Sequence, residues 1–373
     1  MASSSAAPAA NQDDLDPNVK RLAQTITCHA WNADRSLVAI CPNSNSIEIY
    51  ETVDWELKYS LVEHDQVVTG LDWAPNTNRL VSCGQDRNAY VWRWESEQWK
   101  PTLVILRLNR AATFVKWSPN EEKFAVSSGA KVVSICYFEK DNDWWVSKHL
   151  KKHDSTVTRV DWHHGSILVA TSSTDSKVRV FSSFIRGLDK KPGETPFGSR
   201  LPFGEQLGEY LSSTWVHSVR FAPSGNQLAY CSHDSSVTFI DVSQGAENFS
   251  YQIVRSNGLP YVDLQWANEN AIVAAGHNCF PQLFERRADG TWELTRNVDE
   301  QKTEKRAAVG AASAARQMFQ SKVDKGEDKS VGTVLKTKHQ ALINFIQPYA
   351  GQPGNYTGFT TTALDGKLCI WTL

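Results

Sequence analysis

The chain has 373 residues, 41 % of them hydrophobic and 21 % charged, and this composition excludes a largely disordered protein. Its formal net charge of −2 provides no general attraction to nucleic acid or to an anionic membrane. The first residues, MASSSAAPAANQDD, lack the pattern of a signal peptide, and no apolar run is long enough for a membrane-spanning helix. We therefore expect a cytoplasmic globular protein that binds no nucleic acid and inserts into no membrane, with a disordered tail over residues 1–19.

An apolar marker residue, usually aromatic, recurs in pairs along the chain. The first markers end short alternating runs: Trp31, Trp73, Trp117, Trp162, Phe221, Trp266 and Phe345. The second markers close a later run: Tyr50, Trp92, Tyr137, Phe181, Ile240, Phe284 and Trp371. The units mostly repeat every ~42 to 45 residues, the length of a four-stranded propeller blade, and their runs alternate with the period of strands. Seven pairs predict an all-β, seven-bladed propeller that forms one domain over residues 20–373.

A predicted hairpin turn precedes the second marker, and in four units it carries an aspartate: Asp86, Asp175, Asp234 and Asp365. An aspartate there can accept hydrogen bonds from the turn backbone and from a histidine at the start of the blade. The second unit has the full set His64, Ser82, Asp86 and Trp92, and the fourth has His153, Thr171, Asp175 and Phe181. These sets resemble the WD-repeat family. In units one, three and six the aspartate is replaced by Ser44, Lys131 and Asn278. These units must be held together mainly by packing.

The seventh unit provides only three strands before Leu373, with Trp371 in the last of them. A propeller built this way would leave the edge of its last blade unpaired. The free strand-like stretch upstream of Trp31 covers residues 21–27. We therefore expect an N-terminal strand from this stretch to complete the last blade.

The blade period is broken by two insertions. The first, at about 185–210, contains proline, glycine and aromatic residues and is interpreted as a shaped loop. The second, at about 297–338 between blades six and seven, is polar except for a predicted short helix at 307–323, and it should be mobile until it binds something. Met318 and Phe319 lie in this helix, either folded back on the propeller wall or as an anchor for a partner.

Four long segments resemble the propeller subunit family of the actin-related protein 2/3 complex: residues 83–92, 100–152, 199–204 and 271–284. The resemblance covers the chain from about Cys28, except for the sequence of the second insertion. It implies a scaffold subunit of a seven-subunit assembly that nucleates branched actin filaments in the cytoplasmic actin cytoskeleton, at cortical patches or the leading edge. Its implied partners are the other subunits, the acidic tails of activating proteins and the mother actin filament. The filament would contact Met318 and Phe319, with Arg316 and Lys322 at their flanks.

Two further groups are candidate partner surfaces. In the pair Trp144 and Trp145, adjacent strand residues face opposite sides, so one is expected to pack between blades and the other in a subunit contact. The basic set is Arg107, Arg110, Lys116, Lys148, Lys151 and Lys152. It is interpreted either as a surface for acidic tails or as an ordinary solvated blade edge.

Catalysis is not expected. The His, Ser and Asp of the turn sets recur at blade spacing, which favours a structural hydrogen-bond network over a hydrolase triad. No metal-binding histidine spacing and no G-x-x-x-x-G-K-[ST] phosphate loop is present, and the seven cysteines are interpreted as small buried hydrophobes, so no cofactor is expected. The alternative function is a generic WD-repeat adaptor, which would bind peptides in a pocket on one face of the propeller.

Overall fold

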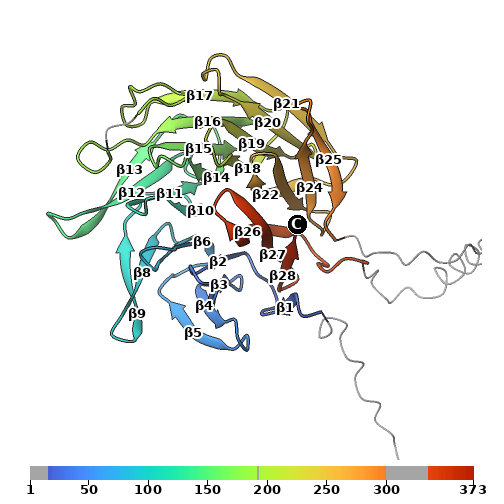
Figure 1. The fold of residues 1–373 in the computed structure, drawn as a ribbon. Coiled ribbons are helices and arrows are strands. Elements are labelled where there is room, and N and C mark those ends of the chain that lie inside the picture. The colour runs from blue at the N-terminus through green and yellow to red at the C-terminus, as the bar shows by residue number, and fades with distance from the viewer. Residues whose placement is uncertain (1–15, 191–192, 300–334) are drawn as a thin grey trace, which may run out of the picture.

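The computed structural model describes residues 16–190, 193–299 and 335–373. The described residues contain no helix and form seven four-stranded antiparallel sheets arranged around a central axis (Figure 1). This confirms the predicted seven-bladed propeller. The chain runs from the inner strand of each blade to its outer strand and then crosses to the next blade.

The first three blades have the following strands. Blade one contains β2 (Cys28–Trp31), β3 (Leu37–Cys41), β4 (Ser46–Glu51) and β5 (Leu57–Val62). Blade two contains β6 (Val68–Ala74), β7 (Arg79–Gly84), β8 (Ala89–Glu95) and β9 (Gln98–Val104). Blade three contains β10 (Ala112–Trp117), β11 (Lys123–Ser128), β12 (Val133–Glu139) and β13 (Trp144–Leu150).

The remaining blades follow the same order. Blade four contains β14 (Val157–Trp162), β15 (Leu168–Ser173), β16 (Lys177–Ser182) and β17 (Gln206–Leu211). Blade five contains β18 (Val216–Phe221), β19 (Gln227–Ser232), β20 (Ser236–Asp241) and β21 (Ser250–Arg255). Blade six contains β22 (Tyr261–Asn268), β23 (Ala271–Gly276), β24 (Gln282–Arg286) and β25 (Trp292–Asn297). Blade seven contains β26 (Ile343–Gln352), β27 (Asn355–Ala363), β28 (Lys367–Thr372) and β1 (Val19–Arg21).

The N-terminal strand β1 closes the ring, as predicted, by pairing with β28 in the register Val19 to Cys369 and Arg21 to Lys367. It lies upstream of the expected stretch, because residues 22–27 form no strand. Their backbone instead bonds to the β27–β28 turn, with the amides of Leu22 and Ala23 donating to the carbonyl of Gly366. Ile26 is fully buried among Trp31, Tyr50 and Leu368, which explains why this segment resembles a strand in sequence.

Carboxylates on the inner strands connect neighbouring blades around the central axis. Asp72 accepts a hydrogen bond from the amide of Trp117 at 2.7 Å, and Asp161 accepts one from the amide of Phe221 at 2.7 Å. Asp263 does the same for Ile346 at 3.0 Å, and the buried guanidinium of Arg220 lies between Asp161 and Asp263. The inner strands are therefore held together by polar contacts as well as by packing.

The first insertion joins β16 to β17 and is anchored by a buried ion pair. The ammonium of Lys123, at the start of β11, lies 2.5 Å from the carboxylate of Asp189, and both side chains are almost fully enclosed. Phe197 and Leu201 add apolar anchors in the core of blades four and five. Since a buried charge that loses its partner is strongly destabilising, this pair fixes the insertion against the propeller.

Alternating strand direction gives the propeller two distinct faces. We call the upper face the one formed by the loops between the second and third strands of each blade and by the connections from an outer strand to the next inner strand. The lower face carries the other loops, including the first insertion. The aspartate turns and the second insertion, which connects β25 to β26, therefore lie on the upper face.

Candidate functional site

The turn of blade two is held by a chain of short hydrogen bonds on the upper face. The two ring nitrogens of His64 bond to Asp86 and to Ser82, each at 2.8 Å, and the indole N–H of Trp92 donates to the Ser82 hydroxyl at 2.9 Å. Asp86 also accepts the backbone amides of Asp65 and Asn88. Burial alone would raise the pKa of Asp86, but these bonds hold it below its usual value.

This arrangement braces the turn and leaves no room for triad chemistry. His64 and Ser82 are buried, and the Ser82 hydroxyl already receives the Trp92 N–H, so no substrate carbonyl can approach it. Blade seven repeats the arrangement, with His339 bonded to Asp365 and Thr361, and with Trp371 bonded to Thr361 at 2.8 Å. His339 and Thr361 were not predicted as members of a turn set, because His339 follows the irregular second insertion rather than an ordinary outer strand.

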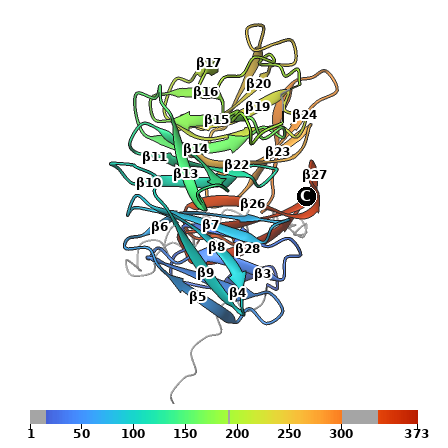
Figure 2. The ribbon, with the colours of Figure 1, turned by 90° about the vertical axis from the view of Figure 1, so that its left-hand side faces the viewer.

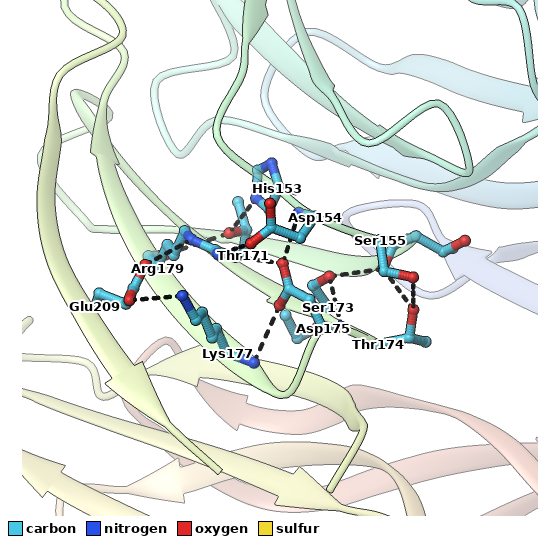
Figure 3. A network of polar contacts seen from close by, with 12 residues as sticks. His153, Asp154, Ser155, Thr171, Ser173, Thr174, Asp175, Lys177, Arg179 and Glu209 are labelled. Atoms are coloured by element: carbon cyan, nitrogen blue, oxygen red, sulfur yellow. Dashed lines mark hydrogen bonds and ion pairs between the residues drawn. The ribbon is translucent and has the colours of Figure 1, made fainter.

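Blade four uses a different partner for its aspartate (Figure 3). His153 bonds to Thr171 at 2.9 Å, but Asp175 binds the guanidinium of Arg179 at 2.8 Å instead of the histidine. Burial, together with the nearby Arg179 charge, lowers the pKa of His153 to about 4. Arg179 is itself buried and also binds Glu209 on the outer strand, so this network joins the turn of the blade to its edge.

The turns of blades five and six use other partners in place of the histidine. In blade five, Asp234 accepts the hydroxyls of Ser213 and Ser236, at 2.8 and 2.6 Å. In blade six, Asn278 accepts the backbone amide of Leu259 at 2.9 Å, so the amide side chain replaces part of the aspartate contact. These blades thus keep a hydrogen-bonded turn without the full residue set.

A basic cluster covers the upper face of blades two and three. Its members, all in connecting loops, are Arg87, Arg107, Arg110, Lys131, Lys151 and Lys152. The cluster segments 85–88, 105–111, 129–132 and 151–156 hold six Lys or Arg and two Asp. Glu63 and Asp65 border the cluster on the side of blade one. Arg87 and Lys131 are not in the predicted basic set and reach this surface from turns far apart in the chain.

The structure does not bring all of the predicted basic set together. Lys116 lies on the inner strand β10 and pairs with Asp161 at 2.5 Å, so it belongs to the central network. Lys148, on the outer strand β13, lies over the rings of Tyr137 and Phe203, beside the first insertion. The basic cluster therefore lacks Lys116 and Lys148 of the predicted set. It gains the turn residues Arg87 and Lys131.

The two tryptophans of β13 lie at its lower end, one strand length from Lys151 and Lys152. Trp145 packs against Trp117, Phe124 and Phe138, and the guanidinium of Arg79 from blade two lies over its ring. The Trp144 side chain is 60 % exposed. One ring of the pair thus packs between blades, and the other is accessible to a partner.

The predicted filament contacts Arg316, Met318, Phe319 and Lys322, with the helix proposed around them, lie outside the described residues. The two ends of that insertion are described. The backbone amide of Lys338 donates to Asp299 at 2.8 Å, and the Lys338 ammonium binds Asp16 at 2.8 Å and lies over the ring of Trp371. The insertion therefore leaves and re-enters the propeller at one fixed point on the upper face.

A cavity of about 1270 Å³ opens on the lower face, between the first insertion and the lower loops of blades three to five. Within the described residues, no group of three or more His, Cys, Asp and Glu side chains is arranged to hold a metal ion. The same part of the chain has no helix that is long and apolar enough to cross a membrane. The seven cysteines are buried and unpaired, which agrees with their interpretation as small hydrophobes.

Seven blades with recurring histidine, hydroxyl and aspartate braces define a WD-repeat β-propeller. The family model described as "WD domain, G-beta repeat" matches residues 55–93, 144–182 and 204–241. The chain is 46 % identical to "Actin-related protein 2/3 complex subunit 1A-B" of Xenopus laevis, over 94 % of each chain. It is 47 % identical to "Actin-related protein 2/3 complex subunit 1" of Schizosaccharomyces pombe, over 92 % of this chain and 96 % of that one. The chain therefore belongs to the actin-related protein 2/3 complex subunit 1 family, and this membership on a WD-repeat propeller indicates a non-catalytic scaffold subunit.

Proposed function

We propose that this chain is the propeller subunit of an actin-related protein 2/3 complex and that it supports nucleation of branched actin filaments in the cytoplasmic actin cytoskeleton, at cortical patches or the leading edge. Identity of 46 to 47 % over nearly the full length of family members carries the proposal, because it includes the interrupted blades as well as the repeats. In this role the chain binds the other subunits and contributes no catalysis. A generic peptide-binding adaptor would not require this likeness outside the turn residues.

The basic cluster of the upper face is the proposed contact for acidic tails of nucleation-promoting factors. Arg107 is supported by a hydrogen bond from its guanidinium to the carbonyl of Ser147, so its position is defined by β13. Arg110, Lys151 and Lys152 are exposed beside it. A dense group of cations of this kind accelerates the binding of an acidic peptide, and this binding weakens steeply as the salt concentration rises.

The mother actin filament is the proposed partner of the second insertion, through Met318 and Phe319 with Arg316 and Lys322 at their flanks. The bond between Lys338 and Asp299 supports this proposal, because it fixes the base from which the segment leaves the upper face. An amphipathic anchor gains affinity when its attachment point is fixed, since less orientational freedom is lost on binding.

Reconstitution of the complex with a tagged chain tests the whole proposal. We expect the chain to co-purify with the other subunits, and the complex to form branches when an activating acidic tail is added. Replacing Met318 and Phe319 by alanine should leave assembly intact and reduce co-sedimentation with filaments, while Lys190→Ala, on the lower face, serves as the control. Failure to co-purify would refute the proposed function, and equal filament binding by a fully assembled double variant would refute the anchor alone.

A further inference from the structure

Three neighbouring hairpins form an acidic rim on the lower side of blades one to three. These are the β4–β5, β8–β9 and β12–β13 hairpins, and Figure 2 shows β4, β5, β8, β9 and β13 on the side turned to the viewer. The hairpins are linked, since Tyr59 of blade one contacts Trp94 of blade two, and β9 contacts β13. We call this surface the acidic rim and define it by residues 51–58, 93–100 and 139–144.

The rim has an excess of free negative charge. Residues 51–58, 93–100 and 139–144 hold eight Asp or Glu and four Lys or Arg. Three of the four cations are already bound within their own hairpins, Lys58 to Glu51 and both Arg93 and Lys100 to Glu95. Asp54, Glu56, Glu97, Asp141 and Asp143 are exposed, and no ion pair involves them in the described part of the chain.

Large apolar side chains lie among these carboxylates. Val53 is 87 % exposed at the first tip, and Trp144 is 60 % exposed at the third. Trp94, at the second, is 38 % exposed and rests on Trp99. Exposed tryptophan is costly in water and is among the residues that contribute most to protein interfaces. Trp145 packs beneath the third hairpin, and the indole N–H of Trp144 donates to Glu139 at 3.3 Å, so little order is lost when a partner covers the Trp144 ring.

The sign of the charge selects the kind of partner. Phosphate backbones and anionic lipid surfaces are repelled by an array of unpaired carboxylates. A protein surface with lysine and arginine around an apolar pocket fits both features, because the ring of Trp144 enters the pocket while the carboxylates meet the cations. The basic cluster on the upper face lies at the other end of the same blades, so the two surfaces bind partners of opposite charge without overlap.

We infer that the acidic rim is a subunit-docking surface for a basic partner within the same assembly, with Trp144 as its apolar anchor. The inference rests on the proposed function, since the partner is another subunit of the complex. It assigns the lower rim of blades one to three to assembly and leaves the upper face free for acidic tails.

Carbodiimide cross-linking of the purified complex tests the contact directly, because the reagent joins a carboxylate to a lysine amine that touches it. We expect Asp141 or Asp143 to be linked to lysines of one other subunit. Trp144→Ala should weaken retention of that subunit on the tagged chain by about tenfold. Asp141→Lys should do the same and should make retention less dependent on salt.

Matched controls come from blade five, on another part of the ring. Tyr251→Ala removes an aromatic side chain that is 65 % exposed, and Glu247→Lys reverses an exposed turn charge, and both should leave retention unchanged. Equal melting temperatures for all variants would exclude a folding effect. A complex that assembles with no cross-link from the rim, and with Trp144→Ala retained as well as Tyr251→Ala, overturns the inference and leaves the proposed function standing. A chain that assembles with no other subunit overturns both.

Discussion

Replacing Gly366 by alanine should open the ring where the two ends of the chain meet. Gly366 lies in the β27–β28 turn with a φ of +75°, and its carbonyl accepts the amides of Leu22 at 3.0 Å and Ala23 at 3.3 Å. A Cβ atom at this position would overlap the carbonyl of Ala23 and lie 2.8 Å from the carbonyl carbon of Gln24. The N-terminal segment would have to move away to accept the methyl group.

The expected loss has two parts. The left-handed backbone costs alanine about 1 kcal/mol relative to glycine. Displacing the N-terminal segment removes the two bonds to Gly366 and endangers the bond from Ile26 to Ala363, at about 1 kcal/mol each. We therefore expect Gly366→Ala to lower the free energy of unfolding by about 3 to 4 kcal/mol.

Gly187→Ala provides the matched control. Gly187 has a φ of +91°, but a Cβ atom at this position would meet no other atom within 4 Å, so alanine there should cost only about 1 kcal/mol. Urea unfolding of the purified chain measures both variants, and hydrogen exchange of the β28 amides reports local opening. Deleting residues 1–21 should resemble Gly366→Ala, whereas deleting residues 1–11 should be harmless. Equal urea midpoints for the two glycine variants would refute the argument that this contact closes the ring.

Two further predictions concern the braces and the buried histidines. Asp86→Ala should lower the free energy of unfolding by about 1 to 3 kcal/mol, because it leaves His64 and two turn amides without an acceptor. The exposed control Lys190→Ala should change it little. An equally small change for Asp86→Ala in urea unfolding would contradict the brace. Lowering the pH from 7 to 5 should reduce stability, because burial lowers the pKa of His29 to about 3 and of His153 to about 4, so the unfolded chain takes up protons that the folded chain refuses. By pH 5 each histidine lowers the free energy of unfolding by up to about 2 kcal/mol, whereas Asp72, whose pKa burial raises to about 6, offsets about 1 kcal/mol of this loss. A urea midpoint that does not fall between pH 7 and 5 would contradict this prediction, as would a His153→Asn variant with the same pH dependence.

The blades were predictable because each aromatic marker occupies a repeated structural position. The first markers lie on inner strands, where Trp73 and Trp162 are buried, and the second markers lie on third strands, as Trp92 and Phe181 do. The closing strand was misplaced by a few residues for a physical reason. A three-residue strand such as β1 buries only Val19 and leaves almost no pattern, while the following loop buries Ile26 and imitates a strand.

Contacts between blades could not be predicted in the same way. Asp161 meets Phe221 and Arg220, which belong to the next blade, and no local pattern indicates such a pairing. Blade four is similar, because the Arg179 guanidinium that binds Asp175 in place of His153 also binds Glu209 of the paired strand β17. Local sequence thus predicts the repeated unit, and the tertiary arrangement decides which polar groups complete it.

The charge of this chain shows how such an arrangement separates surfaces of opposite sign within an ordinary composition. A net charge of −2 gives no general attraction to nucleic acid, but it averages two surfaces of opposite sign. In blade three the antiparallel strand β13 carries Trp144 beside Asp143 at its lower end and leads into Lys151 and Lys152 at its upper end. One strand length therefore separates an acidic, tryptophan-bearing rim from a basic cluster. The two proposed contacts would use this separation, because a subunit docked on the rim would leave the basic cluster open to an acidic tail.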